Sequence, residues 1–236
     1  VRCMIIGKKY RNCLENALNK HNISLICSPD NIYSDERLSG HIDLIMTHMG
    51  KNRIYAAEFL HDSELIHKLS DRGFKFEFEF IANPGNKHYP NDAVMNVCII
   101  GDCVICNLKS ADKRLIEGRK IIRCNQGYTK CSVLVVNENS LITSDKMIAD
   151  KSAHNGLEVL LIDDSFVRLD GFNKGFIGGA SFKISKNKIA FTGRISDKNS
   201  EMLIERFLIE RGISAVYLTD EEIFDIGSAM PIIEEA

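Results

Sequence analysis

The chain has 236 residues, of which 44% are hydrophobic and 26% are charged, and its formal net charge is −2. This composition is that of an ordinary globular protein and excludes a disordered or fibrous chain. The weak net charge provides no strongly basic surface for nucleic acid or for an anionic membrane, so we expect neither partner.

The predicted elements repeat one order along the chain, which is a β-hairpin, a helix and a strand. The predicted strands are 3–6, 23–27, 42–48, 53–56, 74–80, 92–100, 103–106, 120–124, 131–136, 141–143, 158–162, 178–184, 189–192 and 213–218. The predicted helices are 10–20, 61–70, 111–119, 145–154 and 199–210. These elements group into units at 1–31, 41–80, 91–125, 130–163 and 177–219, followed by a tail at 220–236.

The repeat predicts how the units assemble. A hairpin and a helix cannot bury both their faces alone, so neighbouring units must stack, and an array without polar end units closes more readily than it stays open. We therefore predict one α/β domain over 1–236, an α/β propeller of five ββαβ units in a closed pseudo-fivefold ring. The first unit lacks one hairpin strand, and our hypothesis is that Pro231–Ile233 supplies it. An open α/β sheet is the alternative, but paired strands before each helix count against it.

Membrane, export and redox signals are weak in this chain. No segment approaches the roughly 20 apolar residues of a membrane-spanning helix, and Val1–Gly7 is too short for a signal peptide, so we expect a cytoplasmic location. The eight cysteines lie mostly in apolar runs, which favours reduced, buried thiols. Cys103 and Cys106 are three apart in a predicted strand and point to opposite faces. We predict no metal and no cofactor.

Polar residues gather where the first strand of each complete unit begins. If these strands converge near the ring axis, their polar starts would line a central pocket. The candidates are His41, Asp43, Asn91, Asp92, Lys130, Cys131 and Ser181.

Two of these positions suggest chemistry. His41 and Asp43 are two apart, so in a strand they share one face, and an imidazole beside a carboxylate suits a general acid or base. A solvated pair at the start of a strand is the alternative. Cys131 follows a short polar loop beside Lys130, where a partly exposed thiol with a lowered pKa would be a nucleophile. The alternative is that Cys131 is one more structural thiol.

The glycine-rich segment 175–181 indicates a backbone that closely approaches either a ligand or the crowded centre of the ring. No Gly-x-Gly-x-x-Gly or Gly-Lys-Ser/Thr pattern accompanies it, and a strand rather than a helix follows. Close packing at the crowded centre of the ring therefore explains these glycines better than a phosphate cradle.

The chain resembles the pentein fold of the guanidine-modifying enzymes over its whole length. Gly40-His41-Ile42-Asp43 is similar to the family's His-x-Asp motif, and 127–132 is similar to the segment that carries the family's nucleophile. Lys130 stands where the family commonly has His, and one further unit follows Cys131, whereas the family's nucleophile usually lies in the last unit. The segments 89–92, 126–132 and 175–181 more closely resemble an uncharacterised bacterial family known only by this fold.

The resemblance implies a cysteine-dependent hydrolase or transferase acting on a small cationic guanidine or amidine. Cys131 would attack the electrophilic carbon, His41 would protonate the leaving amine and later activate water, and Asp43 with Asp92 would hold the cation. Further candidates for substrate binding are Asn91, Lys130 and Ser181.

The same fold is also found in proteins without catalytic activity, so a catalytically silent protein is the alternative. The ribosome anti-association factor of archaea and eukaryotes has a similar length and ring but no catalytic Cys. The alternative is thus a module that binds a small molecule or a protein partner, or that forms a homo-oligomer, through the same central surface.

Overall fold

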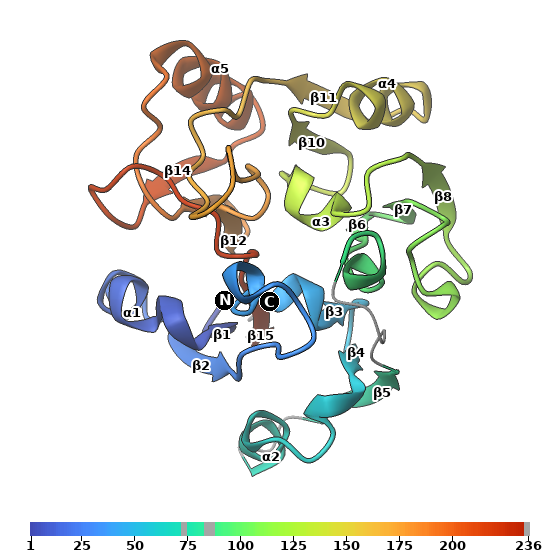
Figure 1. Cartoon of the computed structure of the whole chain (residues 1–236). Helices are drawn as coiled ribbons and strands as arrows, with labels where there is room; N and C mark the ends of the chain where they lie inside the picture. The colour runs from blue at the N-terminus through green and yellow to red at the C-terminus, as the bar shows by residue number, and fades with distance from the viewer. Residues whose placement is uncertain (72–74, 83–87, 234–236) are drawn as a thin grey trace.

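In the computed structural model, residues 1–71, 75–82 and 88–233 are described, and they form an α/β structure (Figure 1). The strands are β1 (Cys3–Gly7), β2 (Ser24–Ser28), β3 (Met46–His48), β4 (Arg53–Ala57), β5 (Glu77–Ile81), β6 (Cys98–Ile100), β7 (Cys103–Cys106), β8 (Lys120–Arg123), β9 (Val133–Val135), β10 (Ser140–Thr143), β11 (Glu158–Leu161), β12 (Ser181–Ser185), β13 (Lys188–Phe191), β14 (Ser214–Tyr217) and β15 (Met230–Ile233). The α-helices are α1 (Arg11–Asn19), α2 (Glu64–Asp71), α3 (Thr129–Ser132), α4 (Lys146–His154) and α5 (Lys198–Ile209). Within the described ranges, no helix has the length and apolar character needed to cross a membrane.

The strands form five sheets of three strands each, in the orders β15-β1-β2, β3-β4-β5, β6-β7-β8, β11-β10-β9 and β12-β13-β14. In every sheet the middle strand pairs antiparallel with one neighbour and parallel with the other, which is the predicted order of hairpin, helix and strand. Figure 1 shows the five sheets arranged around a common centre, with α1, α2, α4 and α5 toward the outside and α3 nearer the centre.

The two ends of the chain meet in one sheet. β15 pairs antiparallel with β1, so that Cys3 lies opposite Ile233 and Ile5 lies opposite Met230. The hypothesis that the C-terminal segment supplies the missing strand of the first unit is therefore confirmed. Residues 234–236 of the predicted tail lie outside the described residues.

Local sequence explains the outer helices. Asp145 caps α4 by accepting a hydrogen bond from the backbone N–H of Ile148 at 2.9 Å, and Asp197 caps α5 in the same way at Ser200, at 2.8 Å. Each such cap stabilises a helix by roughly 1 kcal/mol. Gly156 follows α4 with a φ of +88°, a left-handed conformation that favours glycine and ends the helix.

One predicted helix is wrong. Over 111–119 the structure has only a short 3₁₀ turn at Lys113–Leu115, where the Asp112 carboxylate accepts from the backbone N–H of Arg114 at 2.9 Å. The Asp112 side chain thus caps the start of this turn. Gly118 then turns the chain with a φ of +73° before β8 begins.

The starts of the predicted strands also differ from the structure. Residues Ile42–Leu44, Asn91–Ala93 and Thr129–Ser132 form helical turns, and the strands β3, β6 and β9 begin after them. β12 likewise begins only at Ser181, after a turn. The predicted strand 74–80 is observed as β5, and its first residue, Phe74, lies outside the described residues. The polar candidates before β3, β6 and β9 thus stand on or next to turns, which changes the directions in which they point, whereas Ser181 begins β12.

Candidate functional site

A cavity of about 380 Å³ brings together His41, Cys131 and Asp225, which come from three different parts of the ring. Its aromatic walls are formed by Tyr89, Tyr128, Phe172 and Phe176. Lys174 lies at this cavity and pairs with the buried carboxylate of Asp164. The site is thus an apolar, aromatic cleft with three titratable side chains deep inside, which is the usual composition of a small-molecule site.

Cys131 lies on the one-turn helix α3 and is only 3% exposed. Its thiol donates to Asp43 Oδ2 at 2.8 Å, and Asn96 Nδ2 donates to its Sγ atom at 3.2 Å. The Asn96 side-chain oxygen in turn accepts from the backbone N–H groups of Lys130 at 2.7 Å and of Cys131 at 3.2 Å. Asn96 therefore fixes both the backbone and the sulfur of Cys131.

His41 stands immediately before the 3₁₀ turn Ile42–Leu44 and is 2% exposed. Its Nδ1 atom lies 4.0 Å from Asp225 Oδ1, too far for a hydrogen bond, and its Nε2 atom has no partner among the described residues. Burial lowers the pKa of His41 to about 3, and the positive charge of Lys9 adds to this effect. The imidazole is therefore neutral near pH 7 and has nitrogen atoms free to exchange a proton.

Two backbone N–H groups hold the carboxylate of Asp225 in place. Its Oδ1 atom accepts from Gly227 N at 2.8 Å and its Oδ2 atom accepts from Phe176 N at 2.9 Å. Burial, together with the nearby charge of Asp43, raises the pKa of Asp225 to about 7, although the backbone hydrogen bond from Gly227 opposes this shift.

The glycine-rich segment 175–181 packs against this carboxylate. A Cβ atom added at Gly179 would collide with Asp225 Oδ1, and one added at Gly175 would press on the Asp225 Cβ atom. At Gly178 an added Cβ would meet the backbone carbonyl of Val133. The interpretation of these glycines as a requirement of close packing is confirmed.

The electrostatics of the buried groups favour a neutral thiol in the free protein. Burial raises the pKa of Cys131 well above its usual range, and the negative charges of Asp43 and Asp225 raise it further. Burial also raises the pKa of Asp43 to about 6, although the hydrogen bond from Cys131 and the charge of Lys130 oppose this shift. A cation placed among these groups would lower all three pKa values, because it stabilises each ionised form.

The structure brings His41, Asp43 and Cys131 together, but not as the sequence suggested. One ligand atom from each of the three lies within 4.8 Å of the others. His41 and Asp43 do not share one face of a strand, because the 3₁₀ turn between them directs them to different cavities. The expectation of a partly exposed Cys131 with a lowered pKa is also wrong, since burial has the opposite effect.

The remaining predicted residues do not line the cavity of Cys131. Asn91 is exposed on the turn before β6, and the buried Ser181 hydroxyl donates to the backbone carbonyl of Ile177. Asp92 is buried behind Tyr128, whose hydroxyl donates to Asp92 Oδ2 at 2.6 Å. Lys130 points to a different cavity because the turn α3 sends adjacent side chains in different directions.

Sequence reasoning missed Asn96, Tyr128 and Asp225. Asn96 interrupts an apolar run between Met95 and Val97, and an amide in such a run is a signal of a buried polar role. Asp225 lies in a segment assigned to the tail, where an acidic residue between Phe224 and Ile226 is the corresponding signal. Tyr128 carried no local signal.

The cluster of His41, Asp43 and Cys131 also has the donor types that bind zinc. Imidazole nitrogen, carboxylate oxygen and thiolate sulfur are ligands of Zn²⁺ in proteins, and three protein ligands leave a fourth position open. His41 Nε2 and Asp43 Oδ1 are buried and unpartnered among the described residues, so both retain the capacity to bind a ligand.

Comparisons with known proteins identify the fold. The chain matches a family of unknown function (DUF6873) over residues 5–230, and no curated protein matches it. The amidinotransferase SxtG from Microseira wollei aligns with a TM-score of 0.57 at 8% identity, covering 100% of this chain and 95% of that one. A mutant of DDAH from Pseudomonas aeruginosa, complexed with citrulline, aligns with a TM-score of 0.53 at 11% identity. The alignment covers 89% of this chain and 79% of that one. C. jejuni agmatine deiminase aligns with a TM-score of 0.53 at 13% identity, and the alignment covers 92% of this chain and 75% of that one. These are pentein-fold proteins, so the resemblance in fold is confirmed.

Proposed function

This chain belongs to the family of unknown function DUF6873, and we propose that it is a cysteine-dependent hydrolase or transferase acting on a guanidine or amidine compound. The observation that carries the proposal is the convergence of Cys131, His41 and Asp225 in one aromatic cavity. We also propose that the five sheets form a single closed propeller domain over 1–236. Its pseudo-fivefold arrangement around the centre is supported by the pairing of β15 with β1.

The cavity suits a small planar cation. Asp225 supplies a carboxylate at the cavity wall, and Asp43, which lines the neighbouring cavity, adds a negative charge behind the sulfur of Cys131. Tyr128 and Phe176 offer ring faces, which attract guanidinium and amidinium groups by about 0.5–2 kcal/mol each when the cation is desolvated. Asp92 takes an indirect part, because it accepts the hydrogen bond that orients the Tyr128 ring.

In the first step, Cys131 Sγ forms a bond to the central carbon of the bound amidinium group, and a C–N bond of that group breaks. The thiol first gives up its proton, which is favoured because the bound cation lowers the thiol pKa. His41 relays that proton to the leaving amine through a ring nitrogen. The products of this step are a neutral amine and a cationic adduct on Cys131, which is a thiouronium group from a guanidine or a thioimidate from an amidine.

In the second step, water attacks the same carbon and the C–S bond breaks. His41 accepts a proton from the water, and Cys131 recovers its thiol proton as the urea or amide product leaves. One further proton is released to solvent because the product is neutral. In a transferase, an acceptor amine replaces water and the product remains a cationic amidine.

A screen over arginine, agmatine, methylarginines and simple amidines tests this proposal. Turnover is measured as release of ammonia or of the substituted amine, together with mass-spectrometric identification of the second product. We expect Cys131→Ser to abolish turnover and His41→Ala to lower kcat by about 10²–10⁴-fold. Turnover that survives Cys131→Ser in a folded protein would refute the assignment of the nucleophile.

The burial of Cys131 favours a second candidate function. A 3% exposed thiol with a raised pKa is also what a catalytically silent protein would keep as a structural group. In that case the cavity binds a small cation, or a protein partner, without chemistry. Calorimetry on Cys131→Ala with the same compounds separates the two functions, because saturable binding with no turnover by the wild-type protein supports the silent module.

A further inference from the structure

A second cavity, of about 720 Å³, lies next to the first and shares no lining residue with it. Three short segments separate the two cavities, and each segment contributes residues to both cavities. These include the pairs His41 and Asp43, Cys131 and Lys130, and Asp225 and Ser228, where the first residue of each pair lines the cavity of Cys131. Anything bound in the second cavity therefore touches the segments that build the proposed site.

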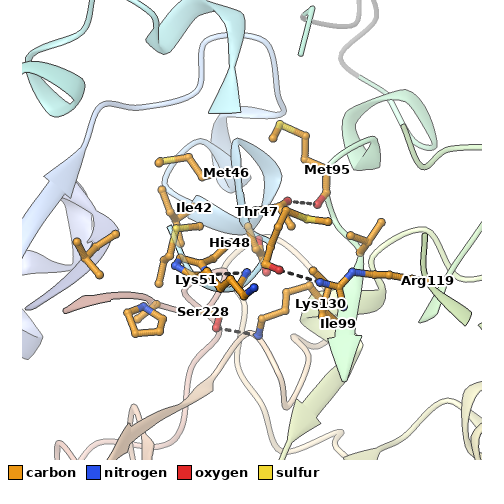
Figure 2. A pocket seen from close by; sticks show the side chains of 18 of the residues that line it. Ile42, Met46, Thr47, His48, Lys51, Met95, Ile99, Arg119, Lys130 and Ser228 are labelled. Atoms are coloured by element: carbon orange, nitrogen blue, oxygen red, sulfur yellow. Dashed lines mark hydrogen bonds between the residues drawn. The ribbon is translucent and has the colours of Figure 1, made fainter. Parts of the chain in front are cut away.

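Basic side chains dominate the charge of the second cavity. Figure 2 shows Lys51, Arg119 and Lys130 gathered in it. Lys130 Nζ donates to Ser228 Oγ at 3.1 Å, and Arg119 donates to the backbone carbonyl of Met49 at 2.7 Å. Among the described residues, none of these three cations forms an ion pair with a carboxylate.

Only two acidic side chains line the described part of this cavity. Asp43 Oδ2 accepts the hydrogen bond of the Cys131 thiol, and Asp43 Oδ1 has no partner among the described residues, so this carboxylate offsets part of the basic charge. Glu138 is exposed to solvent. The cavity therefore retains hydrogen-bond donors with positive charge that match an anionic group.

The rest of the lining is apolar and adaptable. Four methionines lie in it, together with isoleucine and valine side chains, and the methionines are Met46, Met49, Met95 and Met230. Methionine is unbranched and polarisable, so a surface rich in it accepts apolar groups of varied shape. A ligand that matches this cavity combines an acidic head with an apolar body.

We propose that the second cavity binds a small organic anion with an apolar body, and that Lys130 transmits its presence to Cys131. The binding part does not depend on the proposed catalytic function, because it requires neither turnover nor a nucleophilic thiol. The coupling part requires only that Cys131 reacts slowly with a small alkylating reagent.

The sign of the coupling follows from the contacts. Cys131 is only 3% exposed, so alkylation of its sulfur requires the turn α3 to open, and Lys130 lies next to Cys131 on that turn. Lys130 Nζ also bonds to Ser228 Oγ, so Lys130 already ties α3 to the wall of the second cavity. An anion bound to Lys130 stabilises this closed arrangement, so the occupied cavity slows alkylation of Cys131.

The probe is 8-anilinonaphthalene-1-sulfonate, which joins an acidic sulfonate to aromatic rings, titrated against the full chain by fluorescence and calorimetry. We expect one saturable equivalent, with affinity lower by about threefold in Lys51→Gln and by about tenfold in Lys51→Glu. Lys51 is exposed, so these changes leave the fold intact. Lys151→Glu, the same charge reversal on the exposed face of α4, is the matched control and leaves affinity unchanged.

The second readout is the rate at which iodoacetamide alkylates Cys131, followed by peptide mapping. Saturating probe slows this rate by about threefold or more in the wild-type protein, while the exposed Cys13 reacts at an unchanged rate. If neither Lys51 variant changes the affinity for the probe, the proposed site is overturned. If only Phe172→Ala weakens binding of the probe, the probe lies in the cavity of Cys131 instead. An unchanged alkylation rate with bound probe overturns the coupling. Absence of turnover would refute the proposed function and leave these binding results unaffected.

Discussion

Replacing Asp43 by Asn tests the electrostatic account of the Cys131 thiol most sharply. The carboxylate accepts the thiol hydrogen bond at 2.8 Å, and its negative charge raises the pKa of Cys131. Asparagine keeps the size of the side chain and removes the charge. The thiol pKa should therefore fall in Asp43→Asn.

The size of the effect follows from the contact. A hydrogen bond to a charged group contributes roughly 1.5–3 kcal/mol, and one pKa unit corresponds to about 1.36 kcal/mol, so we expect a fall of about one to two units. Below the thiol pKa this raises the thiolate fraction by about 10–100-fold. Because nucleophilicity falls with thiol pKa with a slope of about 0.5, the alkylation rate should rise by about 3–10-fold.

The assay is iodoacetamide alkylation of Cys131 from pH 6 to 10, read by peptide mapping. Asp92→Asn is the matched control, because Asp92 is another buried carboxyl group but bonds to Tyr128 rather than to Cys131. Turnover should fall in Asp43→Asn while alkylation rises, since the negative charge behind the sulfur no longer attracts the cation. An unchanged or raised thiol pKa in a folded Asp43→Asn protein would refute the reasoning.

Three further predictions concern the groups around the thiol. Asn96→Ala should remove the hydrogen bond to the Cys131 sulfur and slow its alkylation by about tenfold, measured at pH 8, and an unchanged rate would show that Asn96 does not position the thiolate. Gly179→Ala should lower the free energy of unfolding by about 1–3 kcal/mol in urea, because its Cβ collides with Asp225, and equal stability would contradict the packing. Burial raises the pKa of Asp225 to about 7, so the stability it contributes is present at low pH and is lost as pH rises from about 4 to 7. Asp225→Asn should therefore gain stability relative to the wild type over that range, and a relative loss would contradict the assignment.

The repeat could be predicted because its elements are determined by local sequence features. Alternating apolar residues, turn residues and the helix stops at Gly156 and Gly212 act within a few positions of one another. The strand β15 was predictable for a different reason. The first unit lacked one strand, and an unpaired edge on β1 requires a partner from elsewhere in the chain.

The directions of the site residues were not predictable in the same way. His41 and Asp43 were assigned to a strand, but the chain forms a 3₁₀ turn there, with the backbone N–H of Asp43 donating to the carbonyl of Gly227 at 3.3 Å. That partner is far away in the sequence, so no local pattern reveals it. The local signal at Asp225 indicates a buried carboxylate but not its place in the site, which depends on a donor from the distant Phe176.

Labelling of Cys131 by a matched pair of reagents tests the central claim directly. 2-Chloroacetamidine carries an amidinium cation, whereas 2-chloroacetamide is neutral and nearly identical in shape. If Cys131 is a nucleophile beside carboxylates that hold a cation, the ratio of the two rates at Cys131 should exceed the ratio at the exposed Cys13 by about tenfold or more. Equal ratios at the two cysteines, or no reaction of Cys131 with either reagent, would contradict the account.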